Sequence, residues 1–149
     1  MNERTAEKIY NEILHMVGKK YLPRSTTTLL QLDNVCNELF GTKFMGTFPS
    51  DMLPVLDDER PYAIINVDKA GMSGSHWVAL VKNKKTVYVY DSFGRPTKNL
   101  IPSVLTSGNG KVRDADYDAE QNTNETDCGA RCVAFLVFVE RYGIKDAMK

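Results

Sequence analysis

Three short apolar segments in the middle of the chain constrain the fold most, because each is typical of a β-strand. Residues 62–67 (YAIINV) are almost entirely apolar, as expected of a strand that is buried on both faces. Residues 76–81 and 86–90 flank the polar sequence at residues 82–85, so these two segments predict a hairpin. A sheet of this composition needs helices to cover its apolar faces.

Apolar side chains at helical spacing on either side of these segments predict three helices. Residues 5–17 form the first such pattern, and Gly18 is expected to end the helix. A second helix is expected between the N-cap oxygens of residues 25–28 and Gly41. The last helix is predicted over residues 128–142.

The remaining segments are expected to be short or irregular. Residues 41–54 predict an ordered loop, because prolines and glycines interrupt them. Residues 96–105 predict a short helix that residues 107–110 end, and residues 111–126 predict a polar strand or loop. We therefore expect one α+β domain over residues 1–149, with helices packed on a small antiparallel-rich sheet.

The composition argues against several classes of protein. Lys+Arg and Asp+Glu both number 19, so the chain has no general attraction for nucleic acid or anionic lipid. No apolar stretch is long enough to span a bilayer, and the N-terminal residues lack the apolar core of a signal peptide. The three cysteines, Cys36, Cys128 and Cys132, do not suit a disulfide framework. We expect a protein of a reducing, intracellular compartment with no membrane partner.

Only two histidines are candidates for a catalytic base. His15 lies inside the first predicted helix and is expected to be an ordinary helical residue. His76 opens the first hairpin strand, directly after Gly71-Met72-Ser73-Gly74-Ser75. This turn of small residues leaves room for a substrate backbone, so His76 is the candidate base.

Asp91 and Cys128 complete a candidate catalytic group. Asp91 ends the second hairpin strand, and the start of one hairpin strand lies beside the end of the next, so His76 and Asp91 should meet. Cys128 opens the last helix, where unpaired amides and the helix dipole stabilise a thiolate and bind an oxyanion. The neighbouring Asp127 opposes ionisation of the thiol unless its side chain caps the helix.

Each of these residues also has an ordinary structural explanation. A cysteine that opens an amphipathic helix is more often a packing residue, and a carboxylate after a strand is more often a turn or cap residue. Cys128 and Cys132 could join His76 in a zinc site, but a fourth ligand is not evident, and we expect no metal. Cys36 lies on an apolar helical stripe and is expected in the core.

Four short motifs are specific when they are taken together in chain order. They are Gly74-Ser75-His76-Trp77, Tyr90-Asp91-Ser92-Phe93-Gly94, Gln121 and Asp127-Cys128-Gly129. This series resembles the adenain family of adenovirus-type maturation proteases, which includes proteases of virophages and virus-like transposons and is related to the proteases that process ubiquitin-like modifiers. Residues 44–48 and 62–67 also look like the segments that precede the histidine there, so the resemblance covers about residues 30–142.

The resemblance implies a papain-like active site in a circularly permuted order. In that arrangement Cys128 is the nucleophile, His76 is the base and Asp91 orients the base. The side-chain amide of Gln121 donates to the oxyanion beside the amide of Cys128. The implied substrate-binding residues, which would line a groove, are Gly74, Ser75 and Trp77.

The sequence also departs from the family pattern. Only residues 129–149 follow the nucleophile. The long C-terminal part of adenain, which helps to bind a peptide cofactor and DNA, therefore has no counterpart here. The cysteine that tethers that cofactor also has none. The chain gains residues 1–24 as an N-terminal helical extension. Activation by peptide and DNA therefore cannot be carried over from the family. We expect no cofactor, no requirement for DNA, and a monomer.

The expected function is that of a cysteine endopeptidase that cleaves viral capsid precursors at glycine-containing sites during virion maturation. Its place would be the virion and the interior of the host cell, in cytoplasm or nucleus. One alternative is a protease that processes ubiquitin-like modifiers, and another is an acyl transferase that uses the same triad. A binding domain without activity is a further alternative, which the intact set of His76, Asp91, Gln121 and Cys128 disfavours.

Overall fold

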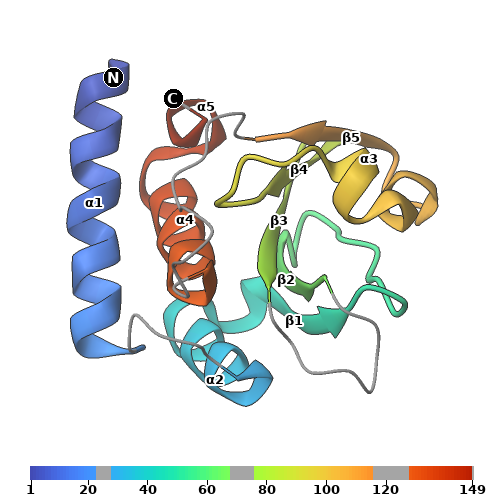
Figure 1. The fold of residues 1–149 in the computed structure, drawn as a ribbon, viewed down its shortest axis with the longest axis horizontal. Coiled ribbons are helices and arrows are strands. Elements are labelled where there is room, and N and C mark those ends of the chain that lie inside the picture. Colours follow the sequence, from blue (N-terminus) through green and yellow to red (C-terminus); the bar gives the residue numbers. More distant parts are fainter. Residues whose placement is uncertain (23–27, 68–75, 116–127, 149) are drawn as a thin grey trace.

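The computed structural model describes residues 1–22, 28–67, 76–115 and 128–148. Its elements, in chain order, are α1 (Glu3–Lys20), α2 (Leu29–Phe40), η1 (Gly41–Lys43), β1 (Phe44–Pro49), β2 (Tyr62–Asn66), β3 (Trp77–Asn83), β4 (Thr86–Tyr90), α3 (Thr97–Leu100), η2 (Pro102–Thr106), β5 (Lys111–Asp114), α4 (Cys128–Tyr142) and α5 (Ile144–Ala147). Helix α4 lies between α1 and the sheet, and α3 with η2 lies on the other side of the sheet (Figure 1).

The sheet has five strands in the order β1-β2-β3-β4-β5. Strand β2 pairs antiparallel with β3, and β3 pairs antiparallel with β4. The edge strands β1 and β5 instead pair parallel with their neighbours. The α+β class is therefore confirmed, whereas the prediction of an antiparallel-rich sheet is wrong because half of the pairings are parallel. Both parallel pairs join strands that are separated in the chain, which a hairpin pattern cannot reveal.

The predicted hairpin is present, with a tighter turn than expected. Asn83 pairs with Thr86, so the strands continue into the predicted turn and only Lys84 and Lys85 connect them. Lys84 has a φ of 58°, the left-handed conformation that a two-residue hairpin turn requires. At the other end of the hairpin, Ala79 pairs with Tyr90, which brings the residues before β3 close to those after β4.

The two faces of the sheet carry separate apolar cores, because successive side chains of a strand point to opposite faces. On β2, Tyr62 and Ile64 belong to the core shared with α1, α2 and α4, while Ala63 and Ile65 belong to the second core. The second core includes Leu56 and side chains of the α3–η2 segment. As predicted, every residue of β2 is buried.

Helix α4 spans residues 128–142 as predicted. Its first twelve residues are all buried, because α1 covers one side of the helix and the sheet covers the other (Figure 1). A helix enclosed in this way needs apolar side chains around most of its circumference. Gly143, with a φ of 92°, follows its last residue and ends the helix.

Helix α1 does not stop at Gly18, as the sequence predicted, but continues to Lys20. The amides of Tyr21 and Leu22 both donate to the carbonyl of Val17, at 2.9 Å each. Val17 and Leu22 are buried in the main core. Their packing outweighs the cost of one glycine in a helix, about 1 kcal/mol, so the pattern break at Gly18 does not end it.

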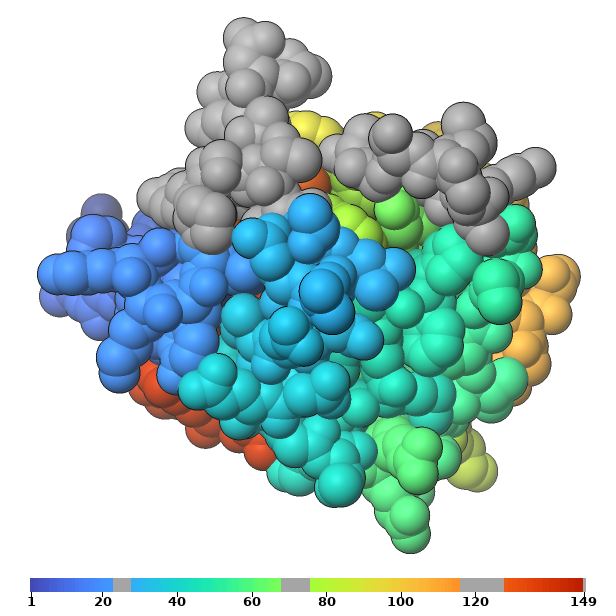
Figure 2. Space-filling view, turned by 90° about the horizontal axis from the view of Figure 1, so that it is seen from below, coloured from blue at the N-terminus to red at the C-terminus, as the bar shows by residue number. Residues whose placement is uncertain are grey.

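Helix α2 begins with a reciprocal capping box between Thr28 and Gln31 and ends before Gly41, which has a φ of 59°. It leads into β1, and the hydroxyl of Thr47 in β1 donates to Asp33 in α2 at 2.7 Å. Figure 2 shows the surfaces of α1 and α2, in blue, continuing into that of the β1 region, in green. Both predicted boundaries of α2 are confirmed.

The prediction that residues 41–54 form a loop is wrong, because this segment contains β1. Gly46 and Pro49 conceal the strand in the sequence. A shift of register between Phe44 and Gly46 places a bulge at the glycine. Pro49 is the last residue of an edge strand, where its missing N–H is tolerated.

The segment of residues 96–105 forms two short helical turns instead of one helix. Pro102 begins the second turn, η2, because proline suits the first position of a helix but not its interior. The polar segment after it forms β5, and the part of that segment at residues 116–126 lies outside the described residues. Across the described segments, no helix combines the length and the apolar character needed to cross a membrane.

Candidate active site

The candidate site lies at the ends of the inner strands of the sheet, where β2 and β4 end and β3 begins. Strand β2 ends at Asn66, which pairs with Trp77 at the start of β3. The amide of Val67 donates to the carbonyl of His76 at 3.0 Å, so the pairing extends one residue beyond the strands. Strand β4 ends at Tyr90, one residue before Asp91. The hairpin therefore fixes the backbone on both sides of the candidate base and its partner.

His76 and Asp91 form a buried pair across the open end of the hairpin. Nε2 of His76 shares a hydrogen bond with Oδ1 of Asp91. The two residues are only 7% and 2% exposed. Their predicted proximity is confirmed. Water has little access to this hydrogen bond, which makes the interaction between the two groups stronger than it would be at the surface.

The turn after β4 holds the carboxylate of Asp91 in place. Oδ2 accepts from the backbone N–H of Arg95 at 2.9 Å and from its Nε at 3.0 Å, and Oδ1 accepts from the amide of Phe93 at 3.3 Å. The amide of Gly94 closes the turn on the carbonyl of Asp91 at 2.8 Å. Burial works to raise the pKa of Asp91, but the hydrogen bonds from His76 and Arg95 lower it below its ordinary value of 3.8.

His76 is poised to carry a positive charge. Burial works to lower its pKa, but hydrogen bonds with Asp91 and Cys128, together with the charges of those two groups, raise it above its ordinary value of 6.5. The ring of Phe93 stacks on the imidazole with the ring centres 4.7 Å apart and the planes 12° apart. The imidazole is therefore fixed in orientation by a carboxylate on one nitrogen and an aromatic ring on one face.

Cys128 is the first residue of α4 and is 5% exposed. Because Asp91 occupies Nε2 of His76, the nitrogen left to exchange a proton with the thiol is Nδ1. The thiol stands at the N-terminal end of a 15-residue helix. The site thus brings together a thiol, an imidazole and a carboxylate from three separate parts of the chain.

The comparisons with known proteins add no identity to this geometry. No family model matches the chain. The chain also has no match among the curated proteins.

Three of the residues predicted for the site, Gly74, Ser75 and Gln121, lie outside the described residues. Trp77 is 3% exposed and belongs to the core under α4, and its role in lining a groove stays a prediction. Cys132 is fully buried one turn after Cys128 on α4.

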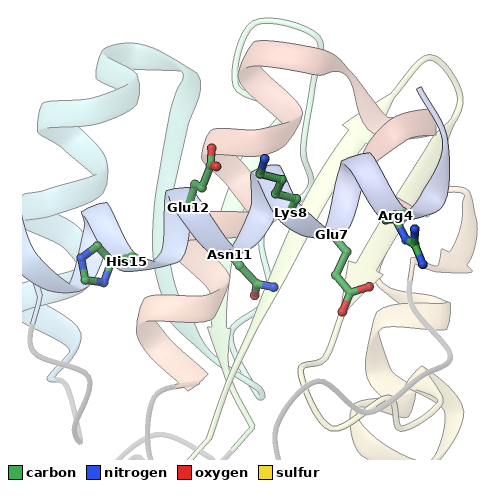
Figure 3. A pocket seen from close by; sticks show the side chains of 6 residues that line it. All are labelled: Arg4, Glu7, Lys8, Asn11, Glu12 and His15. Carbon is green, nitrogen blue, oxygen red and sulfur yellow. The ribbon is translucent and has the colours of Figure 1, made fainter.

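Away from the site, a surface hollow follows one face of α1 (Figure 3). Its lining side chains are Arg4, Glu7, Lys8, Asn11, Glu12 and His15. All of them are polar and come from one helix, and none of the candidate site residues is among them. His15 is exposed there, as expected of an ordinary helical histidine. Among the described residues, no three side chains of His, Cys, Asp or Glu are grouped to hold a metal ion.

The sequence reasoning missed two residues that support the pair, Phe93 and Arg95. Phe93 belongs to the quoted motif but had no role of its own, and Arg95 follows the motif. The guanidinium of Arg95 lies 4.8 Å from the centre of the Phe93 ring, on which it forms a cation–π contact. The available signal was the turn sequence itself, since an Asp that begins a turn commonly accepts from amides a few residues later.

Proposed function

We propose that this chain is a cysteine endopeptidase with Cys128 as nucleophile, His76 as base and Asp91 as the residue that orients the base. The observation that carries the proposal is the buried imidazole of His76, which interacts with a carboxylate and with the thiol that opens α4. Buried ionisable groups need neighbours that stabilise their charge. The neighbours of His76 are a carboxylate and a thiol, which are the groups that thiol catalysis uses.

In the proposed reaction, the thiol proton of Cys128 moves to Nδ1 of His76, and the sulfur attacks the carbonyl carbon of the scissile peptide. A C–S bond forms and the carbonyl oxygen becomes an oxyanion. The imidazolium then gives its proton to the amide nitrogen, the C–N bond breaks and the amine leaves. Water, deprotonated by His76, attacks the thioester and releases the acid and the thiol.

Oxyanion stabilisation in this proposal comes from the backbone N–H of Cys128, because the first amides of a helix have no partner within the helix. By its resemblance to the adenain motif, the side-chain amide of Gln121 is proposed as the second donor. Asp91 stays ionised and holds the Nε2 proton, so that Nδ1 is the free acceptor in the neutral imidazole.

The proposed substrates are glycine-containing segments of viral capsid precursors, cleaved in the virion or the host cell by a monomer without DNA or cofactor. The substrate class rests on the resemblance to adenain-type proteases, whereas the independence of DNA and of a cofactor rests on the departures from that family pattern and on the balanced charge. The chain order His76, Asp91, Cys128 supports it, as does the position of the thiol at the start of a helix packed on the sheet. The papain-like permuted arrangement belongs to the same proposal.

The test is digestion of a library of short peptides by the purified protein. We expect cleavage next to glycine, and none by Cys128→Ala. A matched control is Cys36→Ala, which removes another buried thiol, on α2, and should leave cleavage intact. Cleavage by pure Cys128→Ala protein, or no cleavage of any peptide by the folded wild type, would overturn the proposal.

A further inference from the structure

Arg95 stands between the candidate site and solvent. Its side chain is 44% exposed, whereas that of Asp91 is 1% exposed. Two of its groups, the backbone N–H and Nε, donate to the same oxygen, Oδ2 of Asp91. The other oxygen, Oδ1, is left for His76 and for the amide of Phe93. One oxygen of the Asp91 carboxylate thus bonds to His76, and the other bonds to Arg95.

The same guanidinium also supports the ring that covers His76. Phe93 stacks on the imidazole, and the guanidinium of Arg95 lies over the Phe93 ring, so Phe93 contacts both side chains. A planar guanidinium can bond a carboxylate and stack on an aromatic ring at once, which a lysine ammonium cannot do with the same geometry. Arg95 therefore touches both of the groups that fix the imidazole, the carboxylate of Asp91 and the ring of Phe93.

We propose that Arg95 is a positioning residue of this site, which fixes the carboxylate of Asp91 and limits how strongly that carboxylate holds the imidazole proton. The inference rests on the proposed function only for its catalytic consequence. Two donors on Oδ2 draw negative charge away from Oδ1, so His76 faces a weaker acceptor than a free carboxylate would be. A base that held its proton too tightly would return it slowly to the leaving amine.

The pKa of His76 in a titration would depend on the charged and titratable groups that face its imidazole. Within the described residues they are Asp91 after β4 and the thiol of Cys128 on α4, and Arg95 acts on the imidazole through Asp91. Removing the Arg95 charge should leave Asp91 anionic, because the amides of Phe93 and Arg95 still donate to it. The pKa of His76 should then rise further above its ordinary value.

The test is an NMR titration of the imidazole in a Cys128→Ala background, which needs no activity. The chain has two histidines, so His15 on α1 serves as an internal reference. Arg95→Gln should raise the pKa of His76 by about half a pH unit, a size that reflects a half-exposed charge. The matched control Arg113→Gln removes an exposed charge from β5 and should leave both titrations unchanged.

Arg95→Lys separates charge from geometry. With its charge retained, the His76 titration should stay near that of the parent, while kcat of the active enzyme should fall several-fold because the planar fork is lost. An unchanged or lowered pKa of His76 in Arg95→Gln overturns the positioning role. A raised pKa in a protein that cleaves no peptide supports that role and refutes the protease instead.

Discussion

His76 is buried, and its imidazole interacts with a carboxylate, a thiol and an aromatic ring. A histidine buried for packing alone would have a lowered pKa, because burial disfavours its charged form. Here the hydrogen bonds and charges of Asp91 and Cys128 outweigh burial and raise that pKa. The charged form of the imidazole is therefore stabilised by its neighbours, which is the arrangement that the proposed general base would use.

The opposite shifts of Asp91 and His76 predict a window of pH in which their pairing stabilises the fold. Because folding lowers the pKa of Asp91, its ionised carboxylate stabilises the fold at pH values above its ordinary pKa of 3.8. This stabilisation is lost as the pH falls through the lowered pKa. Because folding raises the pKa of His76, its charged imidazole stabilises the fold at pH values below its ordinary pKa of 6.5. This stabilisation is lost as the pH rises through the raised pKa.

Asp91→Asn should therefore lower the free energy of unfolding by about 2 kcal/mol between roughly pH 4 and 6.5, and by less at higher pH. Urea unfolding across this range measures the difference. The matched control is Asp58→Asn, at an exposed carboxylate. A difference that does not change from pH 4 to pH 9 would contradict the pairing of charges.

At the scale of residues, the sequence was sufficient to place His76 beside Asp91, because hairpin geometry depends only on local pattern and turn. The roles of Phe93 and Arg95 could not be predicted in the same way. Their bonds to Asp91 are local to the turn after β4, but the stacking of Phe93 on His76 also needs the hairpin to bring residues 76 and 93 together, and the turn sequence alone does not specify which side chains will stack.

Among the elements, the loop before β2 depends on one buried side chain, Asn109. Its Oδ1 accepts from the amide of Leu56 at 2.8 Å, and its Nδ2 donates to the carbonyl of Pro54 at 3.0 Å and to Ser107 at 2.6 Å. These bonds join the segment after η2 to the loop that covers the second core. Leu56, which belongs to that core, is thereby held against the sheet.

Asn109→Ala should cost about 2 kcal/mol of unfolding free energy, because it leaves a buried amide and a buried carbonyl without partners. Thermal unfolding, monitored by circular dichroism, measures the loss. Asn99→Ala, at an exposed position of α3, is the matched control and should change stability by less than about 0.5 kcal/mol. Equal effects of the two changes would show that the bonds of Asn109 contribute nothing.

Glu140, near the C-terminal end of α4, bonds to Lys43 in η1 and to Tyr62 in strand β2. Oε1 accepts from Nζ of Lys43 at 2.6 Å, and Oε2 accepts from the hydroxyl of Tyr62 at 2.5 Å. Burial works to raise the pKa of Glu140, but these two hydrogen bonds and the charge of Lys43 lower it. Its contribution to stability should therefore be present above the ordinary value of 4.5 and be lost as pH falls through the lowered pKa.

Glu140→Gln should lower the unfolding free energy by about 1 kcal/mol at neutral pH, since the ion pair is partly exposed to solvent. The loss should disappear in acid, where Glu140 of the wild type is protonated. Glu38→Gln, at an exposed position of α2, is the control. Denaturant midpoints at neutral and acidic pH measure the two losses, and a loss that persists in acid would contradict the role of the charge.

Elements with a strong local pattern were predicted well, and edge elements were not. Helix α4 and strand β2 have continuous apolar patterns of the right length, so their bounds were predictable. Strand β1 was missed because a glycine at a bulge and a terminal proline interrupt it, and its pairing with β2 crosses a long stretch of chain. Helix α1 runs past Gly18 because packing on α4 stabilises its last turn.

The whole molecule is a mixed sheet with an apolar core on each face, and the candidate site lies where the strand ends meet the start of α4 (Figure 1). Helix α1 is integrated with the main core, and the hydroxyl of Tyr10 bonds to that of Tyr90 at 2.8 Å, directly before Asp91. A maturation protease would recognise a few extended residues by main-chain pairing to a strand edge, whereas a modifier protease would bind a broad folded surface.

We therefore expect efficient cleavage of a glycine-containing peptide of about eight residues, a length that fills an extended groove. A folded ubiquitin-like modifier that ends in the same residues should be cleaved poorly. Comparison of kcat/KM for the two substrates measures the preference. If the folded substrate is better by about 100-fold, equivalent to about 2.7 kcal/mol, the modifier-processing alternative replaces the capsid proposal.

The most direct measurement for the central claim is the reaction of the protein with a peptide that ends in an electrophile after glycine. Intact mass and peptide mapping should find one adduct, on Cys128, and His76→Ala should slow its formation by about 100-fold or more. Cys36 and Cys132 are fully buried, and burial also raises the pKa of Cys36, so neither should react. An adduct on either of them, or an unchanged rate in His76→Ala, would contradict the proposed catalytic group.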